Sequence, residues 1–417
     1  MKAMSALLVV AAFLFTSNPF AQQPPPDDSI VEWPSRLHPT LQRAVDAVRP
    51  GGTLVIAPGV HAVPDTVIIR GKRLTIRGAG CRELPREELR GKTKKTSALR
   101  SDKFTQLVGP TPATVVRAED TEPMFDLVDA RVTVTDLELA GFHAGFVTRV
   151  LDRSARDSSF ELRRSCISNV VRGVLAWHPQ VIVQGSYITN ALWTGISVVP
   201  LFPDAGLLHT TLLENVIAAA GYACVVFKNV NGVLGSGVHD CCGHHAGLGA
   251  ADSTVLVTDH DFLKQKGPGM LFVRSKAVVL EGTLNGNGIA GILTWESLLT
   301  VMQTEILESV PVWDPGLQQF VFGDGIAALR SEFTVSDARI HNLPRAGIAN
   351  FGSFGTLTDN QLWCMAIDID GEWYLGQPFV FHDGGGNKCG CTVPPTQTCQ
   401  AVSSSLVPPP PPNEPIP

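Results

Sequence analysis

A glycine followed by an apolar residue recurs at nearly constant intervals through the middle of the chain, and this repeat limits the possible folds more than any other feature. The dipeptides are Gly173-Val174, Gly195-Ile196, Gly221-Tyr222, Gly247-Leu248, Gly269-Met270, Gly291-Ile292, Gly325-Ile326 and Gly347-Ile348. All the intervals between them fall within the range of about 20–50 residues that is typical of solenoids. In a solenoid each unit buries its apolar side chains only by stacking on its neighbours.

Two short strands precede the glycine in each repeat, and the second one ends in a polar turn, as in the segment from Tyr187 to Asn190. Asparagine suits such a corner because it tolerates left-handed backbone geometry and its side chain bonds nearby backbone. The predicted corner residues are Asn169, Asn190, Asn215, Asp240, Lys264, Glu308 and Asn342. The sequence therefore predicts an all-β solenoid with three strands per coil and about ten coils between Thr53 and Asp359.

The stretch from Leu41 to Gly80 predicts how the solenoid begins. Apolar residues recur at helical spacing from Leu37 to Val48, which predicts an amphipathic helix of about three turns. Short β-branched runs separated by turns follow it. This order resembles the N-terminal entry of right-handed parallel β-helix proteins, the pectin lyase-like superfamily. The resemblance implies a helix that closes the N-terminal end of the stack. It indicates no catalytic subfamily, because the motifs of polygalacturonases, alginate epimerases and pectate lyases are missing.

The two ends of the chain differ in composition from the repeats. A basic start, a short apolar run and Ala21 predict a signal peptide over residues 1–21, with an uncleaved anchor as the alternative. Residues 22–36 read as a Pro-rich linker, 37–359 as the β-helix, 360–400 as a Cys-containing flap, and 401–417 as a Pro-rich tail. We therefore expect a secreted, periplasmic or cell-surface protein.

The charge balance excludes two classes of function. The net charge is −6 and only 17% of the residues are charged, so no basic excess predicts nucleic-acid binding. No second long apolar segment predicts a membrane domain after signal cleavage. We expect a monomer.

Nine cysteines in an exported chain favour disulfides. Cys364, Cys389, Cys391 and Cys399 cluster near the C-terminus, where two bridges in any of three pairings would fix the flap. A metal knuckle is the alternative, although no histidine lies at ligand spacing within this cluster.

The densest group of titratable side chains lies between Glu214 and Asp261. A register that turns Val238 and Phe262 inward would turn Glu214, His239 and Asn285 outward in one row, with rungs about 4.8 Å apart. Asp261 would share that face. A carboxylate beside an imidazole serves general acid–base chemistry, so we predict Glu214, His239 and Asp261 as catalytic and Asn285 as substrate-binding.

Two alternatives remain for this group. It could be a surface ion pair among corner residues, or His239, His244 and His245 could bind a metal, although we expect no metal site. Asp259 and Asp261 match a fragment of the calcium-binding aspartate ladder of pectate lyases. Ca²⁺ is therefore the one cofactor that the sequence suggests, without a clear site.

The interval from Gly291 to Gly325 is longer than its neighbours and contains the predicted loop from Val310 to Gly316. Loops that project from a solenoid commonly carry its specificity, so we predict Trp313 and Asp314 as substrate-binding. Two functions follow from these observations. The first is an exported β-helix protein that binds a polysaccharide or cell-surface glycan and cleaves it as a lyase or hydrolase. The alternative is a non-catalytic surface or structural protein.

Overall fold

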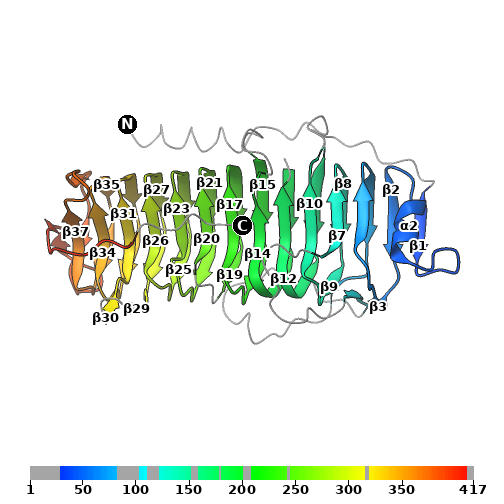
Figure 1. Cartoon of the computed structure of the whole chain (residues 1–417). Coiled ribbons are helices and arrows are strands. Elements are labelled where there is room, and N and C mark those ends of the chain that lie inside the picture. The colour runs from blue at the N-terminus through cyan, green and yellow to red at the C-terminus, as the bar shows by residue number, and fades with distance from the viewer. Residues whose placement is uncertain are drawn as a thin grey trace.

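The structure is a computed structural model that describes residues 29–81, 103–109, 122–151, 158–177, 180–200, 208–241, 245–314 and 319–410. Its strands stack in parallel, coil upon coil, as Figure 1 shows from the blue N-terminal end to the red C-terminal end. Most of the described coils contribute one strand to each of three rows. This is the right-handed parallel β-helix that the sequence predicts.

The first row is a 14-stranded sheet. Its strands are β1 (Ile30–Trp33), β2 (Gly52–Ile56), β5 (Arg73–Arg77), β8 (Arg131–Thr135), β11 (Ser159–Arg163), β13 (Gln180–Gln184), β15 (Leu208–Leu213), β18 (Val230–Gly235), β21 (Thr254–Thr258), β24 (Lys276–Leu280), β27 (Leu298–Met302), β32 (Glu332–Ser336), β35 (Phe354–Thr358) and β38 (Val380–Asp383). The expected number of about ten coils between Thr53 and Asp359 is not confirmed by this row.

The second row consists mostly of short strands. They are β3 (Gly59–Ala62), β6 (Thr105–Val108), β9 (Glu138–Ala140), the first halves of β12 (Cys166–Trp177) and β14 (Tyr187–Val198), β16 (Val216–Ala218), β19 (Val238–Asp240), β22 (Asp261–Leu263), β25 (Thr283–Asn285), β28 (Glu305–Leu307), β33 (Arg339–His341), β36 (Gln361–Trp363) and β39 (Lys388–Cys389).

The third row contains the strands that begin near the repeated glycines. They are β4 (Val67–Arg70), β7 (Pro123–Val128), β10 (Ala144–Arg149), the second halves of β12 and β14, β17 (Ala223–Lys228), β20 (Ala246–Ala251), β23 (Met270–Val273), β26 (Ala290–Trp295), β31 (Asp324–Leu329), β34 (Ala346–Phe351) and β37 (Ile367–Glu372). The last strand of this row is β41 (Ala401–Val402), which pairs in parallel with β37. Outside the rows lie the hairpin of β29 (Val312–Asp314) and β30 (Gln319–Val321), and the short strand β40 (Gln397–Thr398), which pairs antiparallel with β39.

Glycine is required in the third row because the coils approach closely there. A Cβ atom on Gly247 would lie 2.7 Å from the backbone oxygen of Gly269 in the next coil, which real Cβ atoms do not do. The predicted repeat at Gly221 is wrong. The register from Thr194 through Ala223 to Ala246 places Cys224 at the glycine position of that coil, and Cys224 forms a buried disulfide with Cys241.

A hydrogen-bonded ladder of serine side chains stabilises one corner of successive coils. Five serines follow one another at the corner between the third row and the first: Ser253, Ser275, Ser297, Ser331 and Ser353. The hydroxyl of each of the last four accepts the backbone N–H of the serine one coil earlier, as in the 3.0 Å bond from Ser275 to Ser297, and the hydroxyl of Ser253 accepts the N–H of Val230. Because these N–H groups are buried, the ladder satisfies donors that would otherwise be unpaired.

Five of the seven predicted corner residues have the left-handed backbone geometry expected of a sharp corner. Asn169, Asn190, Lys264, Glu308 and Asn342 all have φ between 52° and 55°. The prediction is wrong for Asn215 and Asp240, which do not have this geometry. In the coil of β15 and β16, the left-handed residues are Glu214 and Ala219 instead.

The ends of the solenoid also differ from the sequence expectation. The helix α2 (Leu41–Ala47) is shorter than predicted and begins after Thr40, whose hydroxyl accepts the N–H of Arg43. Figure 1 places it at the blue end of the stack. The strand β1 lies inside the segment expected as a linker, and β36 and β37 continue the coils beyond Asp359. The signal peptide over 1–21 lies outside the described residues.

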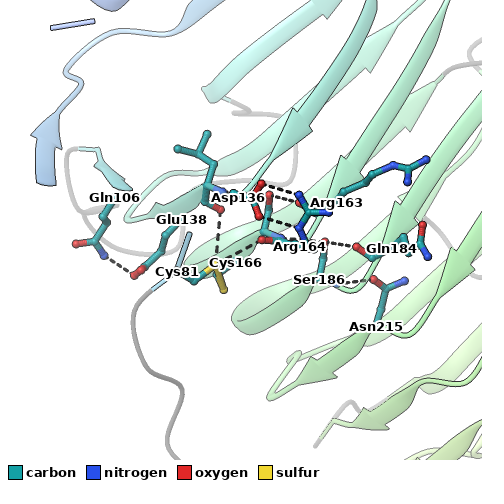
Figure 2. Close-up of a disulfide and its surroundings, with 12 residues drawn as sticks. Cys81, Gln106, Asp136, Glu138, Arg163, Arg164, Cys166, Gln184, Ser186 and Asn215 are labelled. Atoms are coloured by element: carbon teal, nitrogen blue, oxygen red, sulfur yellow. Dashed lines mark hydrogen bonds and ion pairs between the residues drawn. A yellow bond between two sulfur atoms is a disulfide. The ribbon is translucent and has the colours of Figure 1, made fainter. Parts of the chain in front are cut away.

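Three disulfides cross-link the part of the chain that the structure describes. Figure 2 shows the bridge between Cys81 and Cys166 on the outside of the coils, near the 2.7 Å hydrogen bond from Gln106 to Glu138. The second bridge, Cys224–Cys241, lies inside the coil. In the C-terminal flap, Cys389 pairs with Cys399, while Cys364 and Cys391 are free thiols. One of the two predicted flap bridges is therefore present.

Candidate functional site

The predicted orientation of His239 is wrong. His239 is only 1% exposed, and it pairs with Ile217 in one neighbouring coil and Phe262 in the other, both of which face the core. The predicted register placed Val238 inward instead. A slip of one residue reverses every side chain of a strand.

The other members of the predicted catalytic row do not meet. Glu214 is the left-handed corner residue between β15 and β16. Asp261 does lie on the outer side of β22, half-buried between Val238 and Thr283 of the neighbouring coils. The structure therefore does not bring Glu214, His239 and Asp261 together.

The predicted substrate-binding residues belong to two different elements. Asn285 is half-buried on the outer side of β25, between Leu263 and Leu307. The long interval forms the antiparallel hairpin of β29 and β30, in which Trp313 pairs with Phe320 and Asp314 with Gln319. The side chains of Trp313 and Asp314 lie outside what the structure describes.

His239 instead belongs to a buried pair of imidazoles. Its ring centroid lies 4.3 Å from that of His260, which is also 1% exposed. Within the described residues, neither ring nitrogen of His260 has a hydrogen-bond partner, and neither does Nδ1 of His239. Burial lowers the pKa of His260 to about 3. Burial, and then the neighbouring His260, lower the pKa of His239 well below its ordinary value. These neutral, enclosed rings belong to the core.

A different column of side chains lies at the outer corner where the second row turns into the third. It consists of Glu122, His143, Val171, Trp193, Tyr222 and His245, and we call it the corner column. Backbone hydrogen bonds fix its register: Val171 donates to His143, Tyr222 to Trp193 and His245 to Tyr222. Each member immediately precedes a third-row strand or lies at its start. The rungs of a parallel sheet are about 4.8 Å apart, so Glu122 and His143 are neighbours.

A cavity opens at the first rungs of this column. It has a volume of about 180 Å³ and is lined by Asp65, Glu122 and His143, together with Pro64, Thr66, Pro123 and Phe142. Asp65 and Glu122 are exposed, and His143 is half-buried. Two carboxylates and an imidazole thus meet at one solvent-accessible cavity. This is a combination of groups suited to general acid–base chemistry.

A second cavity adjoins the first and shares Asp65 and Thr66 with it. It has a volume of about 670 Å³ and lies between α2 and β4, where Asp46, Arg70 and Lys72 add both signs of charge. The two cavities therefore lie next to each other just before β4.

Further along the corner column, three rings form an aromatic ladder. The Trp193 and Tyr222 rings are stacked, with centroids 4.7 Å apart and planes 4° apart, and the His245 ring lies 4.7 Å from Tyr222. Among the described residues no group accepts a hydrogen bond from the buried Nε1 of Trp193.

The spacing between the column residues and the repeated glycines could have identified this column in the sequence. His143, Trp193 and His245 each lie two positions before a glycine that starts a third-row strand, namely Gly145, Gly195 and Gly247. Gly145 is not among the predicted repeats, although its interval to Gly173 lies within the range that is typical of solenoids. Including it would have aligned these three side chains.

The described residues contain no cluster of three or more His, Cys, Asp or Glu side chains arranged to hold a metal ion. His244, one of the three histidines considered for a metal site, lies outside them. In the same ranges, the structure contains no helix long and apolar enough to cross a membrane.

No protein-family model matches the sequence, and no curated protein matches it significantly. Several solved structures resemble the fold. The catalytic unit of a GH87 alpha-1,3-glucanase from Streptomyces thermodiastaticus shares 13% identity over 94% of this chain and 73% of its own, with a TM-score of 0.49. A GH87 alpha-1,3-glucanase catalytic domain in complex with nigerose shares 12% identity over 88% and 70%, with a TM-score of 0.48.

The enzymatically active domain of tailspike protein 2 from bacteriophage CBA120 shares 13% identity over 74% of this chain and 47% of its own, with a TM-score of 0.46. Likenesses at this level do not extend to activity or substrate. What this chain shows by itself is a parallel β-helix with a cavity of titratable groups at its N-terminal coils.

Proposed function

We propose that this protein binds a polysaccharide along the corner column and cleaves it at the cavity of Asp65, Glu122 and His143. The observation that carries the proposal is that two carboxylates and one imidazole line one cavity at the N-terminal end of the corner column, which carries an aromatic ladder further along. The three disulfides fit an exported protein, in which such a polymer would be met outside the cytoplasm.

The geometry suits a polymer better than a small metabolite. The corner column runs across successive coils, so its functional groups repeat every rung of about 4.8 Å, which is close to the length of one sugar unit. A bound chain would place one unit at the cavity and further units toward Trp193. Remote units held in this way position the reacting bond.

The cavity supplies the groups for either hydrolysis or elimination. Glycoside hydrolysis uses two carboxyl groups, one as acid and the other as base or nucleophile, a role open to Asp65 and Glu122. Elimination needs a base that removes a proton next to a uronate carboxyl, a role open to His143 with Glu122 beside it. The two reactions leave different products.

The test is a panel of acidic and neutral polysaccharides, with absorbance near 235 nm reporting unsaturated uronate and a reducing-end assay reporting hydrolysis. Asp65→Asn, Glu122→Gln and His143→Asn are each compared with Glu332→Gln, an exposed carboxylate on the first row. The proposal predicts that the three cavity variants lose at least about 100-fold in turnover while the control keeps it. Full activity in all three would refute it.

A second function is favoured by a different observation. The outer side of the first row carries threonines at one register position in many coils: Thr53, Thr75, Thr133, Thr211, Thr300, Thr334 and Thr356. A flat wall of this kind fits a non-catalytic structural rod. If the panel yields no cleavage and no binding that depends on the corner column, this second function is the better one.

A further inference from the structure

Two stacked rings lie on the outer side of the second row in the C-terminal coils. His341 of β33 and Trp363 of β36 occupy the same register position, and their ring centroids are 4.3 Å apart with planes 10° apart. The residues before them, Ile340 and Leu362, are fully buried in the core. Alternation along each strand therefore turns the two rings outward, where both are partly exposed.

A carboxylate of the preceding coil holds the imidazole of this pair. Oε1 of Glu305 lies 3.4 Å from Nε2 of His341. Glu305 is directly opposite Arg339 and Leu307 is opposite His341, so this contact is a diagonal one between neighbouring strands. The side chain of His341 is only 13% exposed, which restricts its movement. Glu305 thus fixes the imidazole, and the imidazole supports one face of the indole.

The stack ends at a glycine in the next coil. β36 pairs with β39, with Leu362 opposite Cys389. Trp363 is therefore opposite Gly390. Glycine has no side chain, so residue 390 adds nothing to the stack. The next rung is about 4.8 Å away, which leaves space for one more flat ring against the second face of the indole.

Polar side chains border this space. Gln361 and Lys388 lie two residues before Trp363 and Gly390, on the same outer side, and Lys388 is exposed. The amide carbon of Gln397 lies 3.3 Å from the point that a Cβ atom on Gly390 would occupy. Gln397 is exposed, so its side chain is free to adjust to a ligand. Two amides and an ammonium group therefore surround the second face of the indole.

This combination suits a sugar ring. A pyranose has a face of C–H groups, which packs on an aromatic ring, and hydroxyl groups at its edge, which exchange hydrogen bonds with amides and ammonium groups. A few convergent polar groups around an apolar surface are typical of such sites.

We propose that Trp363 is the platform of a carbohydrate-binding site on the second row, which takes one pyranose unit of a polysaccharide in the rung position opposite the indole at Gly390. Gln361, Lys388 and Gln397 bind the hydroxyl groups of that unit. Glu305 and His341 are positioning residues, because they act through the indole. The site lies on other elements than the cavity of the proposed cleavage, and this proposal does not depend on that function.

The first experiment is hydroxyl-radical footprinting of the full chain, with soluble dextran, xylan or polygalacturonate as the probe and mass spectrometry as the readout. At least one of the three should lower the oxidation of Trp363 about threefold, because the bound ring covers the indole. Trp373, which is 67% exposed on the last coil, is the internal control and should be oxidised at an unchanged rate. Equal oxidation of Trp363 with and without each probe would overturn the proposal.

The second experiment is native affinity electrophoresis in gels that contain the protecting polysaccharide. Trp363→Ala should weaken retardation at least about fivefold, whereas Trp363→Phe, which keeps a flat ring, should retain most of it. Trp373→Ala is the matched control and should migrate as wild type does. Glu305→Gln should weaken retardation less than Trp363→Ala. Wild-type retardation of a Trp363→Ala variant with an unchanged circular dichroism spectrum would count against the site.

Two further variants keep the test decisive. If Trp363→Ala does not fold, Gln397→Ala at an exposed position takes its place and should also weaken retardation, and wild-type retardation of this variant would reject the site. Glu122→Gln separates this site from the proposed cleavage. It should abolish turnover and leave the protection of Trp363 unchanged. Protection of Trp363 in a protein without turnover would reject the cleavage alone, and turnover without protection would reject this site alone.

Discussion

The buried pair of imidazoles makes the stability of this protein sensitive to acid, and His260 is the residue to change. Burial lowers the pKa of His260 to about 3 in the folded chain, whereas an unfolded histidine has a pKa of about 6.5. Between these values the unfolded chain binds a proton that the folded chain does not. The free energy of unfolding therefore rises with pH across this window and falls as the solution is acidified.

The size of the effect follows from the two pKa values. At pH 5 the proton stabilises the unfolded state by about 2 kcal/mol for His260 alone, and at pH 4 by about 3 kcal/mol. The shift of His239 has the same sign and adds to the loss. Burial raises the pKa of Asp324 and Asp370, which works in the opposite direction. The difference between wild type and variant is therefore more informative than the wild-type curve.

His260→Asn is the sharpest substitution because asparagine already works at this position of other coils. Asn360 accepts the N–H of Ala338 and donates to the backbone oxygen of Val335, and Asn215 makes the equivalent bonds to Ser186 and Val183. An asparagine at 260 would meet Gly237 in the same way. We expect stability within about 1 kcal/mol of wild type at pH 7.

The assay is urea unfolding followed by far-UV circular dichroism between pH 4 and pH 7. The variant should lose about 2 kcal/mol less than wild type on going from pH 7 to pH 5. His209→Asn, at an exposed site on the first row, should leave the wild-type pH dependence unchanged. Parallel curves for wild type and His260→Asn would refute the reasoning.

Three further predictions concern other parts of the fold. Asp324→Asn should cost about 3 kcal/mol in thermal or urea unfolding, because Asp324 is fully buried and pairs with Arg345, and unchanged stability would contradict this. Ser297→Ala should cost about 1–3 kcal/mol, since it leaves the buried N–H of Ser275 without its acceptor, while Ser336→Ala outside the ladder should cost less than about 0.5 kcal/mol. The thiol of Cys364 lies 3.6 Å from the backbone oxygen of Cys391, so oxidised glutathione, which accepts the two electrons, should convert both thiols to a second flap disulfide with the loss of two hydrogens. Two thiols that stay reactive after this treatment would end the prediction of two flap bridges.

The sequence by itself determined the architecture, because the architecture depends on a repeat that is written locally. The glycines at 247, 269, 291, 325 and 347 are needed wherever neighbouring backbones approach too closely for a Cβ atom. Their spacing sets the length of a coil. The β-branched runs and polar corners, including Asn169 and Asn342, then predict the strands and bends within it.

Only the tertiary structure decided which side chains meet. The second-row strand Val238–Asp240 is too short for an alternating pattern to fix which of its side chains face inward, and stacking on Ile217 and Phe262 made that choice. Glu122 and His143 are neighbours in space but lie a whole coil apart in the sequence, and a still longer stretch separates Asp65 from Glu122. Each separation includes corners and excursions whose lengths vary from coil to coil. The side chains that share a cavity therefore depend on how the coils stack, which no local pattern in the sequence records.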